Sequence, residues 1–213
     1  MRLFLATRND GKLAEMRRIL AAGVEVVGLD AVAPYDEPVE DRPTFEGNAL
    51  LKARAGLAAT GLPSVADDSG LCVDALNGMP GVLSARWSGP PKSDARNNDL
   101  LLAQLADVPD ERRGASFACA VAFCHPDGTE AVVRGEMRGR VVREVRGSGG
   151  FGYDVLFEAD EAPGVTTAEL TPADKDAISH RGKALREIGP LIAATLTGAG
   201  GGTRTRTPEG TET

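Results

Sequence analysis

The pattern of apolar residues changes near Ala115, and this change restricts the folds that the chain can adopt. Before this point, short apolar runs alternate with segments in which apolar residues recur every three or four positions, as in amphipathic helices. After it, strand-like segments at 115–124, 129–139 and 140–146 follow one another, with an "HPDG" turn after the first. Such a run is typical of an antiparallel meander. The order of these patterns predicts an α/β protein.

The individual elements follow from turn and capping residues. Those predicted before Ala115 are a strand at 3–6, a helix from Leu13 to its stop at Gly23, a strand at 24–29, a helix capped by Thr44 and ended near Gly61, short strands at 62–66 and 71–76 around a "DDSG" turn, a loop at 77–91 and a helix from Asp94. After the meander we expect a strand at 155–159 and a helix over 171–188, which Gly189–Pro190 should kink or divide. We expect one domain over residues 1–197, followed by a disordered polar tail at 198–213.

Charge and composition exclude several classes of partner. The 213 residues carry a net charge of −7 without a basic stripe, which argues against binding to duplex nucleic acid. The N-terminal apolar run is too short for a signal peptide, and no run approaches the roughly 20 apolar residues of a membrane span. Cys119 and Cys124 lie in an apolar strand pattern and are expected to be buried, reduced thiols rather than metal ligands with His125. We therefore expect a cytoplasmic protein.

Asp67 and Asp68 are adjacent acids at the end of an apolar run. Neighbouring carboxylates repel each other, and a charge that leaves water needs a partner. The sequence leaves three candidates for this counter-charge: a lysine, a metal ion, or a substrate that brings its own metal.

Two loops suggest nucleotide chemistry without matching a nucleotide fingerprint. "TRNDGK" at 7–12 places Lys12 and backbone N–H groups at a helix start, which suits a phosphate, but the Walker A spacing is absent and a plain polar turn is the alternative. "GSGGFG" at 147–152 satisfies G-x-G-x-x-G, but no helical pattern follows it, so a Rossmann site is rejected. This loop can instead bring Phe151 and Tyr153 against a flat ligand, or serve as a flexible connection.

Basic residues gather at the start of the C-terminal helical pattern. Lys175, His180, Arg181 and Lys183 form either a solvated helix face or a set of donors for phosphate and carbonyl oxygens. Together with lysines at 12 and 52, acids at 40, 67 and 68, and the aromatic loop, they suit a nucleoside polyphosphate with Mg²⁺. The acids would hold the metal, the cations the phosphates, and an aromatic ring the base.

Several segments then occur in the order seen in the inosine triphosphate pyrophosphatase family, which includes the bacterial XTP/dITP diphosphatases. They are "ATRNDGK", "TFEGNALLKA", "VADDSGLCVDAL", "GMPGVLSARW", "GFGYDVLF" and "ISHRGKAL". The chain resembles this family from about Leu3 to Leu196. The resemblance implies an elongated, twisted mixed sheet with flanking helices and two lobes around a central cleft. It also implies a homodimer that uses Mg²⁺ to hydrolyse dITP, ITP and XTP to the nucleoside monophosphate and pyrophosphate.

The same resemblance assigns roles to individual residues. Asp68 matches the general base and, with Glu40, the Mg²⁺ ligands. The residues matched to substrate contacts are Thr7, Arg8, Asn9, Asp10, Gly11, Lys12 and Lys52 at the phosphates, Ser69 beside the substrate, Phe151, Gly152, Tyr153 and Asp154 at the nucleoside, and Lys175, His180 and Arg181 at phosphate or base. Phe151 is the expected stacking ring. Arg181 or His180 is expected to donate to O6 of a 6-keto purine, which would disfavour adenine because two donors would meet there.

Two departures from the family pattern leave these acids unaffected. Val155 stands where proline is common, and Gly47 stands where glutamate would complete a capping box with Thr44. Two alternative functions also stay open. One is a pyrophosphatase for another modified nucleotide, and the other is a nucleotide sensor without catalysis. Glu40, Asp68 and Lys12 favour an enzyme, because a sensor needs no acid to activate water.

Overall fold

A single mixed sheet organises the chain in the computed structural model, which describes residues 2–20 and 24–197. The elements are β1 (Arg2–Leu5), α1 (Asp10–Leu20), β2 (Glu25–Val27), α2 (Phe45–Thr60), β3 (Ser64–Val73), α3 (Asp94–Gln104), β4 (Gly114–Cys124), β5 (Glu130–Val141), β6 (Phe157–Ala159), α4 (Pro172–Ile178) and α5 (His180–Thr197). Across the sheet the strands lie in the order β2-β1-β3-β4-β5-β6. β1 pairs in parallel with β2 and β3, and the other neighbours are antiparallel. This confirms the predicted α/β class and the mixed sheet.

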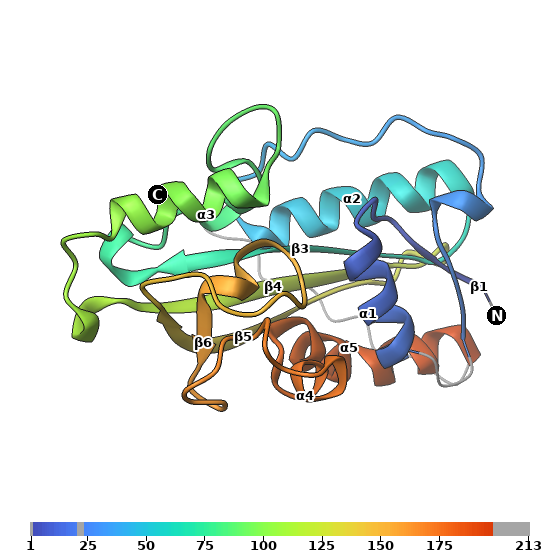
Figure 1. The fold of residues 1–213 in the computed structure, drawn as a ribbon. Coiled ribbons are helices and arrows are strands. Elements are labelled where there is room, and N and C mark those ends of the chain that lie inside the picture. The colour runs from blue at the N-terminus through green and yellow to red at the C-terminus, as the bar shows by residue number, and fades with distance from the viewer. Residues whose placement is uncertain (1, 21–23, 198–213) are drawn as a thin grey trace, which may run out of the picture.

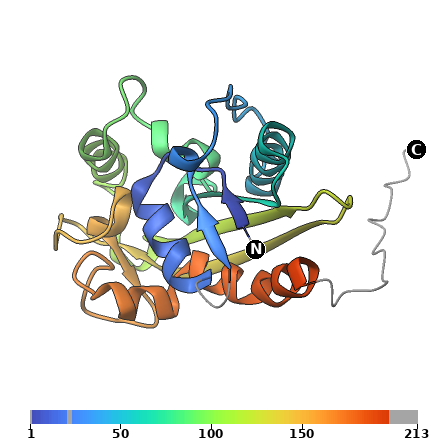
Figure 2. The same cartoon turned by 90° about the vertical axis from the view of Figure 1, so that its right-hand side faces the viewer.

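Helices cover both faces of this long sheet (Figure 1). α2 packs on one face of β3 and β4, and α5 packs on the opposite face of β4 and β5, as the second view also shows (Figure 2). The side chains of β4 alternate between the two faces of the sheet, so this strand contributes to both cores. Cys119, Val121 and Phe123 pack on the α5 side, and the alanines at 118, 120 and 122 pack on the α2 side. A separate apolar cluster at the β6 end includes Leu101 of α3 and Leu105, the residue that follows this helix. None of the described helices is long and apolar enough to cross a membrane.

Capping residues begin and end the helices largely as predicted. The Thr44 hydroxyl accepts a hydrogen bond from the Gly47 N–H at the start of α2, and Gly61 ends that helix at φ +67°. Ser93 caps α3 in the same way. The predicted helix stop at Gly23 and the predicted tail at 198–213 lie outside the described residues.

The predicted "DDSG" turn is wrong, because β3 is one continuous strand of 10 residues. Every residue from Ser64 to Val73 is paired with β4, with Asp67 opposite Val121 and Asp68 opposite Ala120. This long ladder between two interior strands outweighs the local turn preference of Asp, Ser and Gly. Since side chains alternate along a strand, Asp67 and Asp68 point to opposite faces of the sheet.

Two other boundaries also differ from the sequence prediction. The strands expected at 129–139 and 140–146 are one strand, β5, because alternate burial of Gly135, Met137, Gly139 and Val141 continues to its end. The C-terminal helical pattern divides at Ser179, whereas α5 runs on through Pro190. Ser179 is extended, and its hydroxyl accepts a hydrogen bond from the Gly182 N–H, so this residue ends α4 and starts α5.

Candidate active site

One cavity of about 630 Å³ brings the predicted motifs together. Its walls come from the loop before α1, the loop that carries Glu40, α2, β3, the 3₁₀ helix η3 (Gly81–Arg86), the loop after β5, α4 and α5. The predicted site residues that line it are Thr7, Arg8, Asn9, Gly11, Lys12, Glu40, Lys52, Asp68, Ser69, Phe151, Gly152, Tyr153, Asp154, Lys175, His180 and Arg181. The side chain of Asp10 is outside the described part of the structure.

Asp68 lies on the α2 face of β3 and is held at both carboxylate oxygens. The Asn48 amide donates to Oδ2 at 2.9 Å, and the Ser69 N–H donates to Oδ1 at 3.0 Å. Lys52 Nζ is 3.9 Å from Oδ1. Burial, helped by the charge of Glu40, raises the pKa of Asp68 above its usual range despite Lys52 and Asn48. Asp68 is therefore a fixed, buried carboxylate with increased affinity for a proton.

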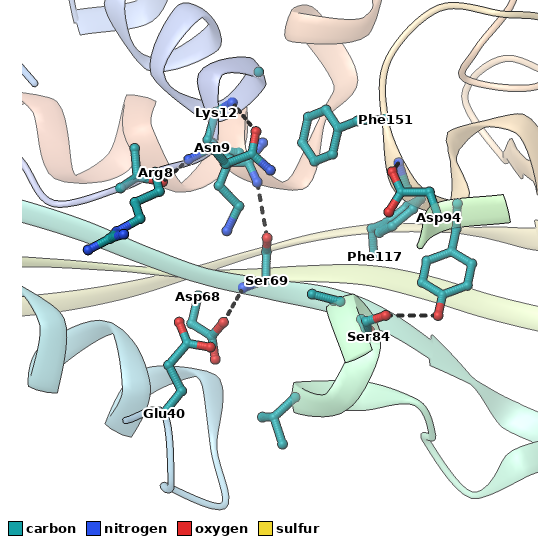
Figure 3. A pocket seen from close by; sticks show the side chains of 18 of the residues that line it. Arg8, Asn9, Lys12, Glu40, Asp68, Ser69, Ser84, Asp94, Phe117 and Phe151 are labelled. Atoms are coloured by element: carbon teal, nitrogen blue, oxygen red, sulfur yellow. Dashed lines mark hydrogen bonds between the residues drawn. The ribbon is translucent and has the colours of Figure 1, made fainter. Parts of the chain in front are cut away.

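Figure 3 shows Glu40 beside Asp68. The Lys52 ammonium group lies close to a carboxylate oxygen of each. Lys52 Nζ lies 2.5 Å from Glu40 Oε1, and Arg86 Nη1 lies 3.5 Å from Oε2. Burial raises the pKa of Glu40, but Lys52, Lys12 and Arg86 together lower it by more, so the pKa lies below its usual value and this carboxyl group ionises readily. No cluster of three or more metal-ligating side chains occurs among the described residues. Two carboxylates beside a cavity lined by lysines fit Mg²⁺, which usually takes one or two protein carboxylates and completes its shell with water and substrate phosphate.

Asp67 occupies the opposite face of β3 and already has its own counter-charges. Its Oδ2 lies 2.9 Å from Lys12 Nζ and accepts a hydrogen bond of 3.1 Å from Arg181 Nε. Burial alone would raise the pKa of Asp67, but Lys12 and Arg181 outweigh it and hold the pKa well below its usual range. The question raised by the adjacent acids thus has two answers. Asp67 is neutralised by protein cations, and only Asp68 faces the proposed metal position.

Arg181 is held by three acceptors. Besides Asp67, it donates from Nη1 to Glu15 and from Nη2 to the Ser69 hydroxyl, at 3.0 Å in the second case. Ser179 also donates to Glu15 at 3.0 Å. These buried contacts join α1, β3 and the start of α5 at the wall of the cavity, which Arg181 itself lines. Each guanidinium nitrogen of Arg181 has a protein partner, so this residue holds these elements together.

The other end of the cavity is aromatic. The Phe151 ring has Lys175 Nζ 5.1 Å and the Arg181 guanidinium 5.8 Å from its centroid. His180 stacks on Phe117 with ring centroids 5.0 Å apart. Burial and then the neighbouring cations Arg181 and Lys175 hold the pKa of His180 well below its usual value, so its imidazole is neutral. Within the described residues, His180 Nδ1 has no hydrogen-bond partner.

The loop that carries Phe151 is held in place by Asp154. The carboxylate of this buried residue accepts from the Phe151 N–H at 2.8 Å, from Lys175 Nζ at 2.5 Å and from the Thr167 hydroxyl at 2.8 Å. Lys175 is therefore grouped with the aromatic end of the cavity. The Tyr153 hydroxyl donates to the carbonyl oxygen of Ser84 at 2.9 Å, which anchors the loop to η3.

Sequence reasoning missed several residues at this site. Glu15, Asn48 and Arg86 contact predicted site residues, and Phe117 and Asp94 line the cavity. Asn48 had a readable signal, because it lies one turn before Lys52 on the face of α2 that Phe45 and Ala49 mark as buried. Phe117 had none, since it looks like any other apolar strand residue.

Comparison with known proteins connects this geometry to a family. The model of the Ham1 family matches residues 3–190. A "dITP/XTP pyrophosphatase" of Nocardia farcinica is 65% identical over 197 residues, covering 91% of this chain and 95% of that protein. One of Mycolicibacterium paratuberculosis is 61% identical and covers 89% of this chain and 95% of its own length.

Solved structures agree with these relatives. The crystal structure of a "Nucleoside-triphosphatase / dITP/XTP pyrophosphatase" from Mycobacterium abscessus has a TM-score of 0.73 at 55% identity, covering 88% of this chain and 98% of that one. The Staphylococcus aureus Ham1 protein has a TM-score of 0.81 at 34% identity, covering 92% and 100%. The resemblance seen in the sequence motifs is confirmed, and the chain belongs to the Ham1 family.

Proposed function

We propose that this chain is a nucleoside triphosphate pyrophosphatase that hydrolyses dITP, ITP and XTP to the nucleoside monophosphate and pyrophosphate, and so removes non-standard purines from the nucleotide pool. One observation carries the proposal: a single cavity is lined both by carboxylates and lysines, among them Asp68 and Lys52, and by the Phe151 ring. Such a site suits a polyphosphate and a flat base on the same ligand. The names of the relatives from Nocardia and Mycolicibacterium support the same substrates.

In the proposed reaction, water attacks the α-phosphorus and the bond from that phosphorus to the bridging oxygen of pyrophosphate breaks. Asp68 accepts the proton of the attacking water, which its buried, hydrogen-bonded position favours. Lys12 and Lys52 offset the negative charge that builds on the departing pyrophosphate. Glu40 and Asp68 would hold Mg²⁺, which when bound neutralises phosphate oxygens and polarises the phosphorus.

Base selection is proposed to occur at the aromatic end. Phe151 stacks on the base, and the neutral imidazole of His180, which lines the cavity, donates to O6 through an N–H group. Adenine would present an amino group to this donor and leave both groups unpaired. Arg181 would contribute by holding His180 and Ser69 in place.

We further propose that residues 1–197 form one two-lobed unit that works as a homodimer in the cytoplasm, where its proposed substrates arise. Light scattering measures the mass of the purified protein in solution. For a dimer we expect twice the mass of the 22.2 kDa chain.

A nucleotide panel tests the activity directly. The purified chain would be given dITP, XTP, ATP and GTP, with Mg²⁺ or with excess EDTA, and pyrophosphate and orthophosphate would be measured separately. We expect pyrophosphate from dITP and XTP only with Mg²⁺, and at least tenfold less from ATP and GTP. Orthophosphate as the main product, or tight binding of dITP without turnover, would overturn the proposal.

A further inference from the structure

Gly152, the residue after the proposed stacking ring, is held from α3 through both of its backbone polar groups. Its N–H donates to Asp94 Oδ2 at 2.8 Å, and its carbonyl oxygen accepts from Asn98 Nδ2 at 3.1 Å. Asp94 and Asn98 lie one turn apart on α3, so they face the same side of the helix. Figure 3 shows Asp94 in the cavity wall, beside Phe117 and across from Phe151.

The segment before α3 adds a third anchor to the same turn. The Ser84 carbonyl oxygen accepts from the Tyr153 hydroxyl at 2.9 Å and from the Asn97 amide at 3.3 Å. Tyr153, Asn97 and Asn98 are buried, so these hydrogen bonds are shielded from competing water. The turn after Phe151 is therefore attached to α3 and η3 at several points.

Phe151 would otherwise sit in a flexible stretch. Gly150 and Gly152 flank it at φ +70° and +62°, a region that glycine enters readily, and glycine gives the unfolded loop many alternative conformations. Holding such a loop in one conformation costs entropy, and a ligand that must order it binds more weakly. Contacts that order the loop in advance improve the affinity for whatever the ring stacks on.

We propose that Asp94 and Asn98 are positioning residues that fix Phe151 for the base of the nucleotide, an inference that rests on the proposed function. The Glu40, Asp68 and Lys52 end of the cavity is built from other elements, namely α2, β3 and the loop before α2. The two residues should therefore act on binding of the nucleoside part. The bond-breaking step and the binding of pyrophosphate should be unaffected.

Calorimetry with the two halves of the product pair tests this separation. Titration with dIMP reports the nucleoside end, and titration with Mg²⁺-pyrophosphate reports the phosphate end. We expect Asp94→Ala and Asn98→Ala each to raise the Kd of dIMP about tenfold, which corresponds to about 1.4 kcal/mol, and to change the Kd of pyrophosphate less than twofold. With dITP as substrate, KM should rise and kcat should change less than threefold.

Two controls accompany these variants. Asp99→Ala removes the same charge from an exposed position of the same helix and should leave both Kd values unchanged. Asp94→Asn keeps an oxygen that can accept from the Gly152 N–H, so it should recover most of the affinity for dIMP. Asp94 is exposed, so its variant should fold even if Asn98→Ala does not.

Unchanged dIMP binding in Asp94→Ala would overturn the inference, as would a parallel loss of dIMP and pyrophosphate binding, which marks a general structural defect. A wild-type chain that binds no dIMP would overturn it as well. By contrast, a wild-type chain that binds dIMP but does not cleave dITP would overturn the proposed function alone, because the calorimetric comparison needs no turnover.

Discussion

At the scale of single residues, Asp68 is fixed by hydrogen bonds from Asn48 and the Ser69 N–H, and Lys52 has a closer carboxylate partner in Glu40 than in Asp68. Asp68→Asn keeps the size of the side chain and removes its ability to take a proton from water. We expect kcat for dITP to fall about 100-fold or more, with the free energy of unfolding changed by less than about 1 kcal/mol. Steady-state kinetics and urea unfolding measure the two quantities. Full activity in this variant would exclude Asp68 as the base.

Asp67 provides the matched comparison. The same substitution one residue earlier should lower the free energy of unfolding strongly, whereas Asp68→Asn should change it little. Its carboxylate neutralises Lys12 and Arg181 inside the protein, and its side chain is fully buried. Asp67→Asn removes the carboxylate that pairs with Lys12 and leaves Arg181 with Glu15, so the free energy of unfolding should fall by about 3–5 kcal/mol. Unfolding in urea measures the loss. A variant as stable as the wild type would show that these ion pairs contribute little.

The predictable part of the site at this scale is the set of residues that lie in compact motifs. Such motifs contain Lys12, Asp68 and Phe151. Each of these residues stands among glycines or charged residues in a pattern that a purely structural role rarely requires. Their supports could not be read in the same way. Glu15 is one charge among many on a polar helix, and its contact with Arg181 spans 166 positions of the chain. Only the folded sheet brings such pairs together.

At the scale of elements, β5 and α5 approach each other closely at Gly135. A Cβ at this position would collide with the carbonyl oxygen of His180 and come within 2.8 Å of the backbone nitrogen of Ala184. Gly135→Ala should therefore displace the first turn of α5 and lower the free energy of unfolding by about 1–3 kcal/mol. It should also weaken dITP binding, since His180 begins that turn. Urea unfolding and KM for dITP check both effects.

Gly189→Ala is the control for this change, because it lies within α5 with nothing near its Cβ position. Alanine is favoured over glycine inside a helix, but a Cβ on the residue before Pro190 disfavours helical backbone, so the free energy of unfolding should change by less than about 1 kcal/mol. Equal destabilisation by both substitutions would mean that the close approach of β5 and α5 is not what matters.

Elements whose ends carry capping residues are predictable from the sequence, and elements decided by pairing are not. Thr44 and Gly61 define α2 locally, and the structure has that helix where these residues place it. The "DDSG" segment has the composition of a turn, yet it lies inside β3 because β4 offers a partner along its whole length. Likewise, Ser179 rather than Pro190 divides the last helices, since the Ser179 hydroxyl can cap a new helix start.

At the scale of the whole molecule, the buried neutral state of His180 should make folding depend on pH. The imidazole packs on Phe117 among Arg181, Lys175 and Lys12, with Asp67 as the nearby acid. Burial first, and then the cations, hold its pKa in the folded protein well below the value of 6.5 expected in the unfolded chain. The unfolded chain therefore binds more protons below about pH 6.5, so the contribution of His180 to stability is complete above that pH and is lost as the pH falls from there toward the folded pKa.

The loss for one group is at most about 1.4 kcal/mol per pH unit, and urea unfolding between pH 7.5 and 5 can measure it. The pKa of Asp67 is lowered from its usual value of 3.8, so this group changes the stability only below about pH 3.8 and adds nothing between pH 7.5 and 5. The pKa of Asp68 is raised, so this group favours the folded state as the pH falls, opposite to His180. The pH dependence of each variant must therefore be compared with that of the wild type rather than with a slope calculated for one group. We expect His180→Gln to flatten the dependence on pH. The same steep loss in His180→Gln as in the wild type would show that another buried group controls the acid sensitivity of the fold.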